Sequence, residues 1–218
     1  MGFRAILILI CNQVTGTDIS PEMIGVCEQL YKEDAYTFFT AKAEETPIPE
    51  TSYDVITAAG VINWVDRERF LKNAMQILSP DGLIIIYDFW ITDQMADNQE
   101  YTTWYQEEYL KEFPKPPRNE DIWTQKDMPD GFHIEKQVVY KMTYQFSLEE
   151  FIDFMMIQSN VNAKIAGREK TEEEIREWMH KTLYHIFSSQ KRTLVFSGYN
   201  WYVRKKIKKI EKSFLSKV

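Results

Sequence analysis

The chain has 218 residues, of which 44% are hydrophobic and 27% charged, enough apolar material for the core of one soluble globular domain. Its formal net charge of −7 argues against non-specific nucleic-acid binding, which needs a basic face. Cys11 and Cys27 lack metal-site spacing, which predicts reduced thiols and a cytoplasmic location. The apolar run Ala5–Ile10 is shorter than the hydrophobic region of a signal peptide, and no stretch approaches the about 20 apolar residues of a membrane span.

Residues 14–24 combine a strand, an acidic residue and the start of a helix. Val14–Thr17 have the composition of a short buried strand. Ser20-Pro21-Glu22 is typical of a helix start, because Ser caps, Pro suits the first turn and an acid suits the positive end of the helix dipole. Asp18 falls on the turn between them, where an open α/β sheet binds ligands and an acid can accept hydrogen bonds from both hydroxyls of a ribose. A capping Asp would look much the same, so both roles stay open.

The next segments alternate between strands and helices up to residue 89, which predicts an α/β fold with crossover helices. Helices are predicted where apolar residues recur at helical spacing, over Pro21–Glu33 and Arg67–Leu78. The prolines of Ala41–Glu50 predict a loop, and Ser79–Gly82 has the composition of a turn. The remaining predicted strands are Tyr36–Thr40, Tyr53–Ala59 and Leu83–Phe89, of which the second and third read as buried.

The second half of the chain predicts a partly helical cap followed by a strand pair with helices between its strands. Residues 90–132 scatter aromatic side chains among acids, amides and prolines, and we interpret them as a cap over one end of the sheet. Two capping boxes predict the starts of helices that run to Ile157 and to about His185; they pair Ser147 with Glu150 and Thr171 with Glu174. The predicted strands are Glu135–Phe146 and Lys191–Arg204, paired antiparallel. Residues 204–218 form a basic tail, predicted to be solvated, although it could bind an acidic surface.

Four segments, in order and spacing, resemble the class I S-adenosylmethionine-dependent methyltransferases, in the small-molecule branch of the ubiquinone-biosynthesis and trans-aconitate methyltransferases. They resemble the family's second strand, its adenine-side loop, its fourth strand with the exit, and the turn with the fifth strand. The segments are Thr15–Met23, Ala41–Pro49, Ser52–Thr57 continuing to Asn63-Trp64, and Ile77–Ile86. The resemblance implies a Rossmann-like, mostly parallel sheet with an antiparallel C-terminal hairpin and helices on both faces.

The resemblance also implies site residues, with S-adenosylmethionine as cofactor and a small molecule as methyl acceptor. The residues implied at the cofactor are Asp18 on the ribose hydroxyls, Ile19 against the adenine, Ala43 with Glu44 at the adenine ring, and Ala59 and Gly60 at the methionine end. Trp64 would face the sulfonium, where an aromatic ring favours a cation, or would pack in the core. Candidate acceptor contacts are Asp88 and Trp90, which leave the fifth strand, and with lower preference Tyr87, His133, Tyr144 and Asn160.

Three departures from the family pattern bear on these roles. Lys42 stands where a small or acidic residue is frequent, which puts an adenine contact from that side chain in doubt. Asn63 replaces the histidine of a His-Trp pair, and because Asn cannot act as a general base, no base is assigned there. The family's first strand and its glycine-rich loop have no counterpart, since only thirteen residues precede Val14 and Gly2 is the sole glycine among them.

The N-terminal residues allow two interpretations. Ala5–Ile10 could be a strand, but the three residues before Val14 are too few for a parallel crossover and would make only a hairpin. We favour a helix over Phe3–Gln13. The expectation is a methyltransferase-like domain over residues 1–203 without the first strand, as in a truncated family member. Two functions stay open: methyl transfer to a small molecule, or a non-catalytic methyltransferase-like protein that binds or interacts. A third, nucleotide binding by a dehydrogenase-like domain, also needs a glycine-rich loop and fits the later strand pair less well.

Overall fold

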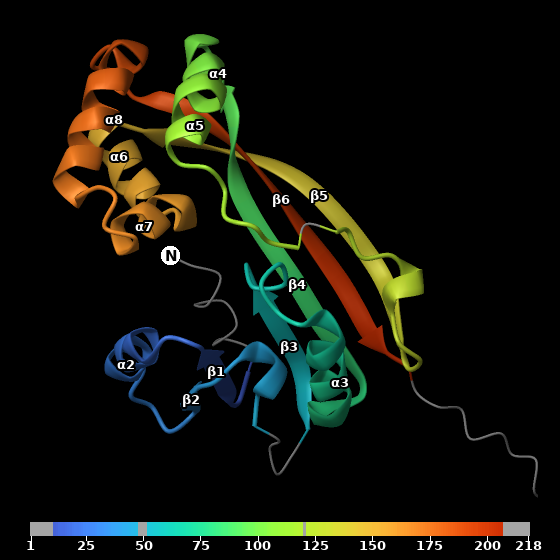
Figure 1. Cartoon of the computed structure of the whole chain (residues 1–218). Coiled ribbons are helices and arrows are strands. Elements are labelled where there is room, and N and C mark those ends of the chain that lie inside the picture. Colours follow the sequence, from blue (N-terminus) through green and yellow to red (C-terminus); the bar gives the residue numbers. More distant parts are fainter. Residues whose placement is uncertain (1–10, 48–51, 120, 207–218) are drawn as a thin grey trace, which may run out of the picture. The chain divides into compact units, whose positions relative to one another are not determined.

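The computed structural model describes residues 11–47, 52–119 and 121–206, which form a mixed α/β fold (Figure 1). The strands make a two-stranded sheet in the order β1-β2 and a four-stranded sheet in the order β3-β4-β6-β5. The chain divides into two compact units, described separately below. Unit 1 holds the described residues of Met1–Ile86, Asp121–Lys136 and Trp201–Val218, and unit 2 those of Tyr87–Glu120 and Gln137–Asn200.

In unit 1, β1 (Val14–Asp18) and β2 (Tyr36–Thr40) pair in parallel, joined by helix α2 (Pro21–Leu30). The predicted helix start is confirmed, because the Ser20 hydroxyl accepts a hydrogen bond from the backbone N–H of Met23. The helix ends three residues before its predicted end. β1 was expected to be buried, but all its residues are only partly buried in the described part of the chain.

The rest of unit 1 packs around α3 (Arg67–Ile77), whose N-terminus is capped by the Asp66 carboxylate through a hydrogen bond from the backbone N–H of Arg69. The predicted inner face of this helix is confirmed: the buried side chains are Phe70, Leu71, Ala74 and Ile77. β3 (Tyr53–Ala59) has its predicted bounds, but the prediction that it is buried is wrong, because only Ala58 is buried along it. β3 lies at the edge of its sheet, where a strand has a neighbour on one side only.

The predicted turn at Ser79–Gly82 is wrong, because these residues lie inside the long strand β4 (Leu78–Met95). The turn-like composition of these residues coincides with an irregular backbone within the strand, because Asp81 has a φ of 63°, in the left-handed region. Gly82 is needed for close packing, since a Cβ at this position would lie 2.5 Å from Cγ of Leu78. The predicted strand Leu83–Phe89 is confirmed as the middle of β4, which continues through Trp90 into the segment expected as a cap.

Unit 2 combines helices with segments of β4, β5 and β6 around its own aromatic core (Figure 1). Both predicted capping boxes are confirmed: Ser147 with Glu150 opens α6, and Thr171 with Glu174 opens α8. The helix α7 was not predicted. The helical elements of this unit are α4 (Glu100–Thr103), the π-helix η2 (Trp104–Tyr109), α5 (Leu110–Glu112), α6 (Leu148–Met156), α7 (Ser159–Ala166) and α8 (Glu172–Phe187).

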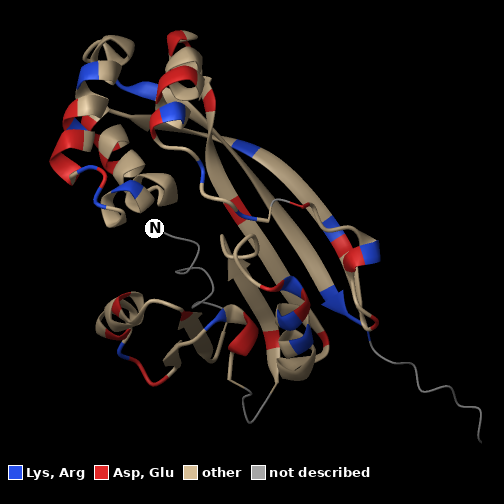
Figure 2. Cartoon of the chain, in the orientation of Figure 1, with Lys and Arg blue, Asp and Glu red and all other residues tan. Residues whose placement is uncertain are grey.

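The strands β5 (Phe132–Phe146) and β6 (Arg192–Lys205) are neighbours in the sheet. The Arg204 side chain of β6 donates a hydrogen bond to Glu135 near the start of β5, and the Gln145 side chain near the end of β5 donates one to Thr193 near the start of β6. The two strands therefore run in opposite directions. The predicted antiparallel pairing is therefore confirmed. Figure 2 shows the charged residues gathered mainly on helices and loops, while β3 and the middle of β4 carry few.

Two expectations concern the ends of the chain. The predicted helix over Phe3–Gln13 is wrong at its end, because residues 11–13 are not helical, and residues 1–10 lie outside the described residues. Most of the basic tail, residues 207–218, lies outside them as well. No helix in the described part of the chain has both the length and the hydrophobicity to cross a bilayer.

Candidate functional site

Asp18 is the last residue of β1, and its carboxylate already has a structural role. Oδ1 accepts a hydrogen bond from the backbone N–H of Ser20 at 2.9 Å, which fixes the turn into α2. The capping role that the sequence left open for Asp18 falls to Ser20, and Asp18 instead holds the turn before the cap. A carboxylate offers about four lone-pair sites, so one N–H leaves room for the hydroxyls of a diol. The two roles are compatible in this geometry.

The loop expected at the adenine lies next to Asp18 because β1 and β2 are parallel and end together. Asp18 is opposite Thr40 in the register, and its backbone carbonyl accepts a hydrogen bond from the N–H of Ala41 at 2.9 Å. The chain then forms a 3₁₀ turn, η1 (Ala43–Glu45), closed by a hydrogen bond from the Thr46 hydroxyl to the carbonyl of Ala43. Asp18 and the loop that holds Ala43 and Glu44 are thus neighbours.

Helix α3 holds this loop from its other side. The Arg69 guanidinium forms an ion pair with Glu45 at 2.9 Å, and the Asn73 amide donates to the backbone carbonyl of Thr46 at 3.0 Å. The Arg69–Glu45 pair is about half exposed, so it orients the loop more than it stabilises the fold. Ile19, the residue after Asp18, leaves 72% of its surface exposed, as a side chain that packs on a ligand needs.

Ala59 and Gly60 follow from the end of β3. Gly60 has a φ of 64°, which an L-residue adopts with strain, so the glycine is required by the turn itself. Trp64 comes after this turn and leaves 51% of its surface exposed, so the alternative of core packing does not hold for it. Asn63 accepts a hydrogen bond through its Oδ1 from the Arg67 guanidinium, which ties it to the start of α3.

Asp88 and Trp90, the preferred acceptor contacts, lie on the part of β4 that belongs to unit 2. Burial raises the pKa of the Asp88 carboxyl, and a hydrogen bond from the N–H of Phe89 together with the nearby Arg118 charge offsets this only in part. Trp90 is 41% exposed and lies against Tyr199 with ring centroids 6.1 Å apart.

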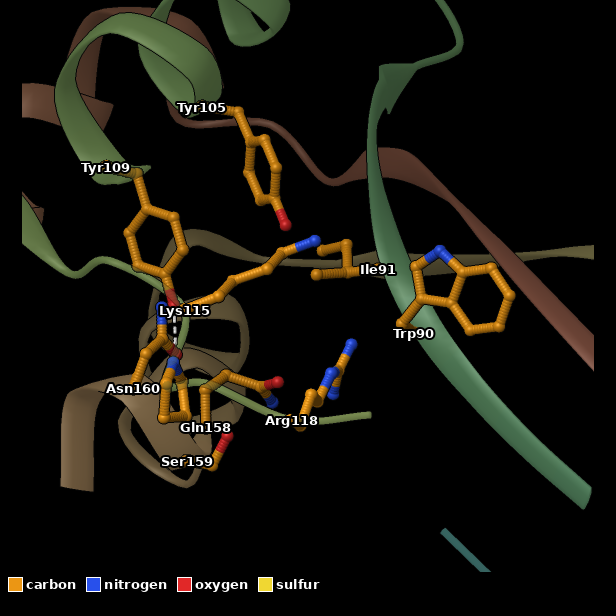
Figure 3. A pocket seen from close by; sticks show the side chains of 10 residues that line it. Trp90, Ile91, Tyr105, Tyr109, Lys115, Arg118, Gln158, Ser159 and Asn160 are labelled. Carbon is orange, nitrogen blue, oxygen red and sulfur yellow. Dashed lines mark hydrogen bonds between the residues drawn. The ribbon is translucent and has the colours of Figure 1, made fainter. Parts of the chain in front are cut away.

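Unit 2 contains a cavity of about 70 Å³ (Figure 3). It brings together Trp90 and Asn160, two of the predicted acceptor contacts, whereas Asp88, Tyr87, His133 and Tyr144 are not among its lining residues. Sequence reasoning missed the other members, which come from β4, η2, the segment after α5, and the start of α7. These are Ile91, Tyr105, Tyr109, Lys115, Pro116, Arg118, Gln158 and Ser159. The spacing of Tyr105 and Tyr109, four residues apart, was the one available signal that they share a helix face.

The described residues contain no group of three or more His, Cys, Asp or Glu side chains arranged to hold a metal ion.

The two sets of predicted site residues lie on separate units. Asp18, Ile19, Ala43, Glu44, Ala59, Gly60 and Trp64 belong to unit 1, and Asp88 and Trp90 to unit 2. The hydrogen bond from the N–H of Ala41 to the carbonyl of Asp18 joins Asp18 to the loop of Ala43. Ala59 is the last residue of β3, and Gly60 follows it.

Comparison with known proteins finds similarity in the first part of the chain. The methyltransferase domain family matches residues 2–86. The chain is 35% identical over 81 residues to a ubiquinone/menaquinone biosynthesis C-methyltransferase of Geotalea daltonii, covering 35% of this chain and 34% of that protein. It is 33% identical over 79 residues to a malonyl-[acyl-carrier protein] O-methyltransferase of Porphyromonas gingivalis, covering 36% and 29%. The match thus spans about a third of the length of these relatives.

The fold has a solved counterpart over nearly the whole chain. The structure of a candidate type II methyltransferase from Anaeromyxobacter dehalogenans superposes with a TM-score of 0.65. The superposition covers 93% of this chain and 83% of the other, at 17% sequence identity. At this identity the likeness concerns the fold alone, and the predicted Rossmann-like α/β class is confirmed.

Proposed function

We propose that the protein is a class I S-adenosylmethionine-dependent methyltransferase that transfers a methyl group from this cofactor to a small-molecule acceptor, a proposal supported by the family match over residues 2–86. The observation that supports this most is the position of Asp18 at the carboxyl end of β1, beside the Ala43 loop. A carboxylate there can accept hydrogen bonds from both hydroxyls of a ribose, and the loop can cover the adenine base. The cytoplasmic location and the division into a domain over residues 1–203 with a cap stay proposals as well.

The residues present fit part of what the cofactor needs. Asp18 would hold the ribose, the exposed Ile19 would lie on one face of the adenine, and Ala43 and Glu44 would border the ring. The turn at Gly60 lets the backbone approach the methionine end closely. The cofactor supplies an activated methyl group on a sulfonium when bound. Methyl transfer is a direct displacement, so these residues contribute alignment and exclusion of water.

The test is binding of S-adenosylhomocysteine to the full chain, measured by titration calorimetry, with Asp18→Asn as the variant. Asn keeps an oxygen for the N–H of Ser20, so the turn into α2 survives, but it removes the charge and one acceptor oxygen. We expect saturable binding by the wild-type protein and a loss of about tenfold in the variant, since charge-assisted hydrogen bonds to the diol are removed.

Asp34→Asn is the matched control, because Asp34 is exposed on the turn before β2 and the change in net charge is the same. It should leave the affinity unchanged. Equal weakening by both variants would mean that the effect is long-range electrostatics and would contradict a ribose contact. If the wild-type chain shows no binding at all, the non-catalytic alternative, a methyltransferase-like protein that binds or interacts, replaces the proposal.

A further inference from the structure

The cavity of unit 2 combines a positive charge with an aromatic wall. Among its ten lining residues are two cations, Lys115 and Arg118, and none of the ten is acidic. Figure 3 shows the Lys115 side chain reaching across the cavity toward the hydroxyl of Tyr105, with the Arg118 guanidinium between Gln158 and Trp90. The lining is therefore suited to a negatively charged group.

The segment that carries both cations is held in place. Asn160, which is buried, donates a hydrogen bond from Nδ2 to the backbone carbonyl of Phe113 at 2.7 Å. The next residues include Pro114, Pro116 and Pro117, and each proline ring fixes one backbone dihedral. The backbone around the two cations is restricted before any ligand arrives, which lowers the entropic cost of binding one.

Neutral donors and a helix end add to this charge. Burial and the nearby Asp93 raise the pKa of the Tyr105 hydroxyl, and Arg118 lowers it in part, so the hydroxyl stays protonated at neutral pH and can donate. The Ser159 hydroxyl also lines the cavity, at the first residue of α7. The side chain of Gln158 makes no capping bond there, so the positive end of the helix dipole is not screened by its own cap.

Two acids interact with lining residues of the cavity without lining it themselves. Asp88 interacts with Arg118 electrostatically, yet the net effect of its surroundings is a raised pKa, because burial outweighs that attraction. Asp93, which raises the pKa of Tyr105, accepts a short hydrogen bond from the Gln106 amide. Lys115 brings a second positive charge to the cavity.

We propose that this cavity binds an anionic group, a carboxylate or a phosphate, on the methyl acceptor. That the anion belongs to the acceptor rests on the proposed function; the binding of the anion does not. The cavity volume of about 70 Å³ suits a small head group rather than a whole acceptor. The apolar remainder would lie along Trp90, a residue that is 41% exposed.

The test titrates the full chain, without cofactor, with benzoate, phenyl phosphate and the neutral benzamide, followed by calorimetry. We expect at least one anion to bind roughly tenfold tighter than benzamide, as charge-assisted hydrogen bonds predict. Preference for benzoate or for phenyl phosphate then distinguishes the two anions. Lys115→Gln and Arg118→Gln should each weaken the affinity for the anion by about threefold to tenfold and leave the affinity for benzamide unchanged.

Lys111→Gln is the matched control, because it removes the same charge from α5, where Lys111 pairs with Glu107 outside the cavity. Its anion affinity should equal that of the wild type. The proposal is overturned by equal binding of benzoate, phenyl phosphate and benzamide, by an equal loss in Lys111→Gln, or by no anion binding up to about 10 mM. Because the cofactor is omitted, anion binding in a chain that fails to bind S-adenosylhomocysteine would refute the proposed function and leave this site standing.

Discussion

Asn160 is a buried polar side chain that joins two segments distant in sequence. Its Oδ1 accepts a hydrogen bond from the Tyr109 hydroxyl at 3.1 Å, and its Nδ2 donates to the carbonyl of Phe113. Burial raises the pKa of Tyr109, more than the bond to Asn160 lowers it, so the hydroxyl is protonated and donates at neutral pH. A single amide thus satisfies two polar groups of the η2–α5 segment from the start of α7.

Asn160→Ala should destabilise the protein by about 2–4 kcal/mol, because it leaves the Tyr109 hydroxyl and the Phe113 carbonyl without their partner. Tyr109→Phe should cost less, about 1–2 kcal/mol, since only Oδ1 of Asn160 loses its bond. Urea unfolding followed by circular dichroism measures both. Asn162→Ala, on the exposed side of the same helix, is the control and should change stability by less than about 0.5 kcal/mol. A cost for Asn160→Ala equal to that of Asn162→Ala would refute this account.

At the scale of elements, the start of α8 depends on a reciprocal cap. The Thr171 hydroxyl accepts from the N–H of Glu174, and the Glu174 carboxylate accepts from the backbone N–H and the hydroxyl of Thr171. These bonds to Thr171 lower the pKa of Glu174, because they favour its charged form. A lowered pKa means stability that is present above the ordinary value of 4.5 and lost as the pH falls through the folded value.

Glu174→Gln should therefore lower the melting temperature at pH 7 and have less effect at pH 3, where a larger fraction of the wild-type carboxyl is protonated than at pH 7. Thermal melts followed by circular dichroism at the two pH values measure the difference. Glu173→Gln is the control, because it removes a charge from the adjacent residue in the same helical turn. If Glu173→Gln shows the same pH-dependent difference, the effect belongs to the helix dipole and not to the cap.

The cap of α8 shows why some elements could be predicted from the sequence: a capping box needs only four consecutive residues. The same holds for α3 and for the strand pair β5 and β6, whose patterns are local. Helix α7 was missed because its N-cap is Gln158, whose side chain makes no capping bond. The turn predicted at Ser79–Gly82 was wrong because of contacts distant in sequence. The local composition does mark an irregular backbone at Asp81, but pairing in the sheet continues the strand through these residues.

Part of the candidate site could be predicted from the sequence, and part could not. Asp18 and Ala43 could be named from the resemblance, and parallel pairing of β1 with β2 makes them neighbours. The cavity of unit 2 could not be predicted, because Lys115 and Ser159 lie more than forty residues apart and their segments are joined by long-range contacts such as the hydrogen bonds of Asn160. Contacts of this kind leave no periodic signal in one sequence.

At the scale of the whole molecule, burial is uneven. Unit 2 holds a continuous cluster of buried apolar side chains from β4, η2, α6, α8 and β6. Among residues 11–47, by contrast, Ile24 is the one buried hydrophobic side chain. Several large apolar side chains of this segment are exposed, namely Ile19, Met23, Val26, Leu30 and Phe39. The segment β1–α2–β2 therefore has little buried apolar surface to stabilise it locally.

Hydrogen exchange should reveal this difference. We expect the amides of β1, α2 and β2 to exchange on the order of 100-fold faster than those of α6 and α8, since local opening costs less where few apolar contacts break. Helix α3 is the internal control, because it belongs to unit 1 but has a buried face, and it should be protected. Protection of α2 equal to that of α8 would contradict the argument. Under the proposed function, S-adenosylhomocysteine should slow exchange at Asp18 and in η1, where its binding would order the segment, and leave α8 unchanged.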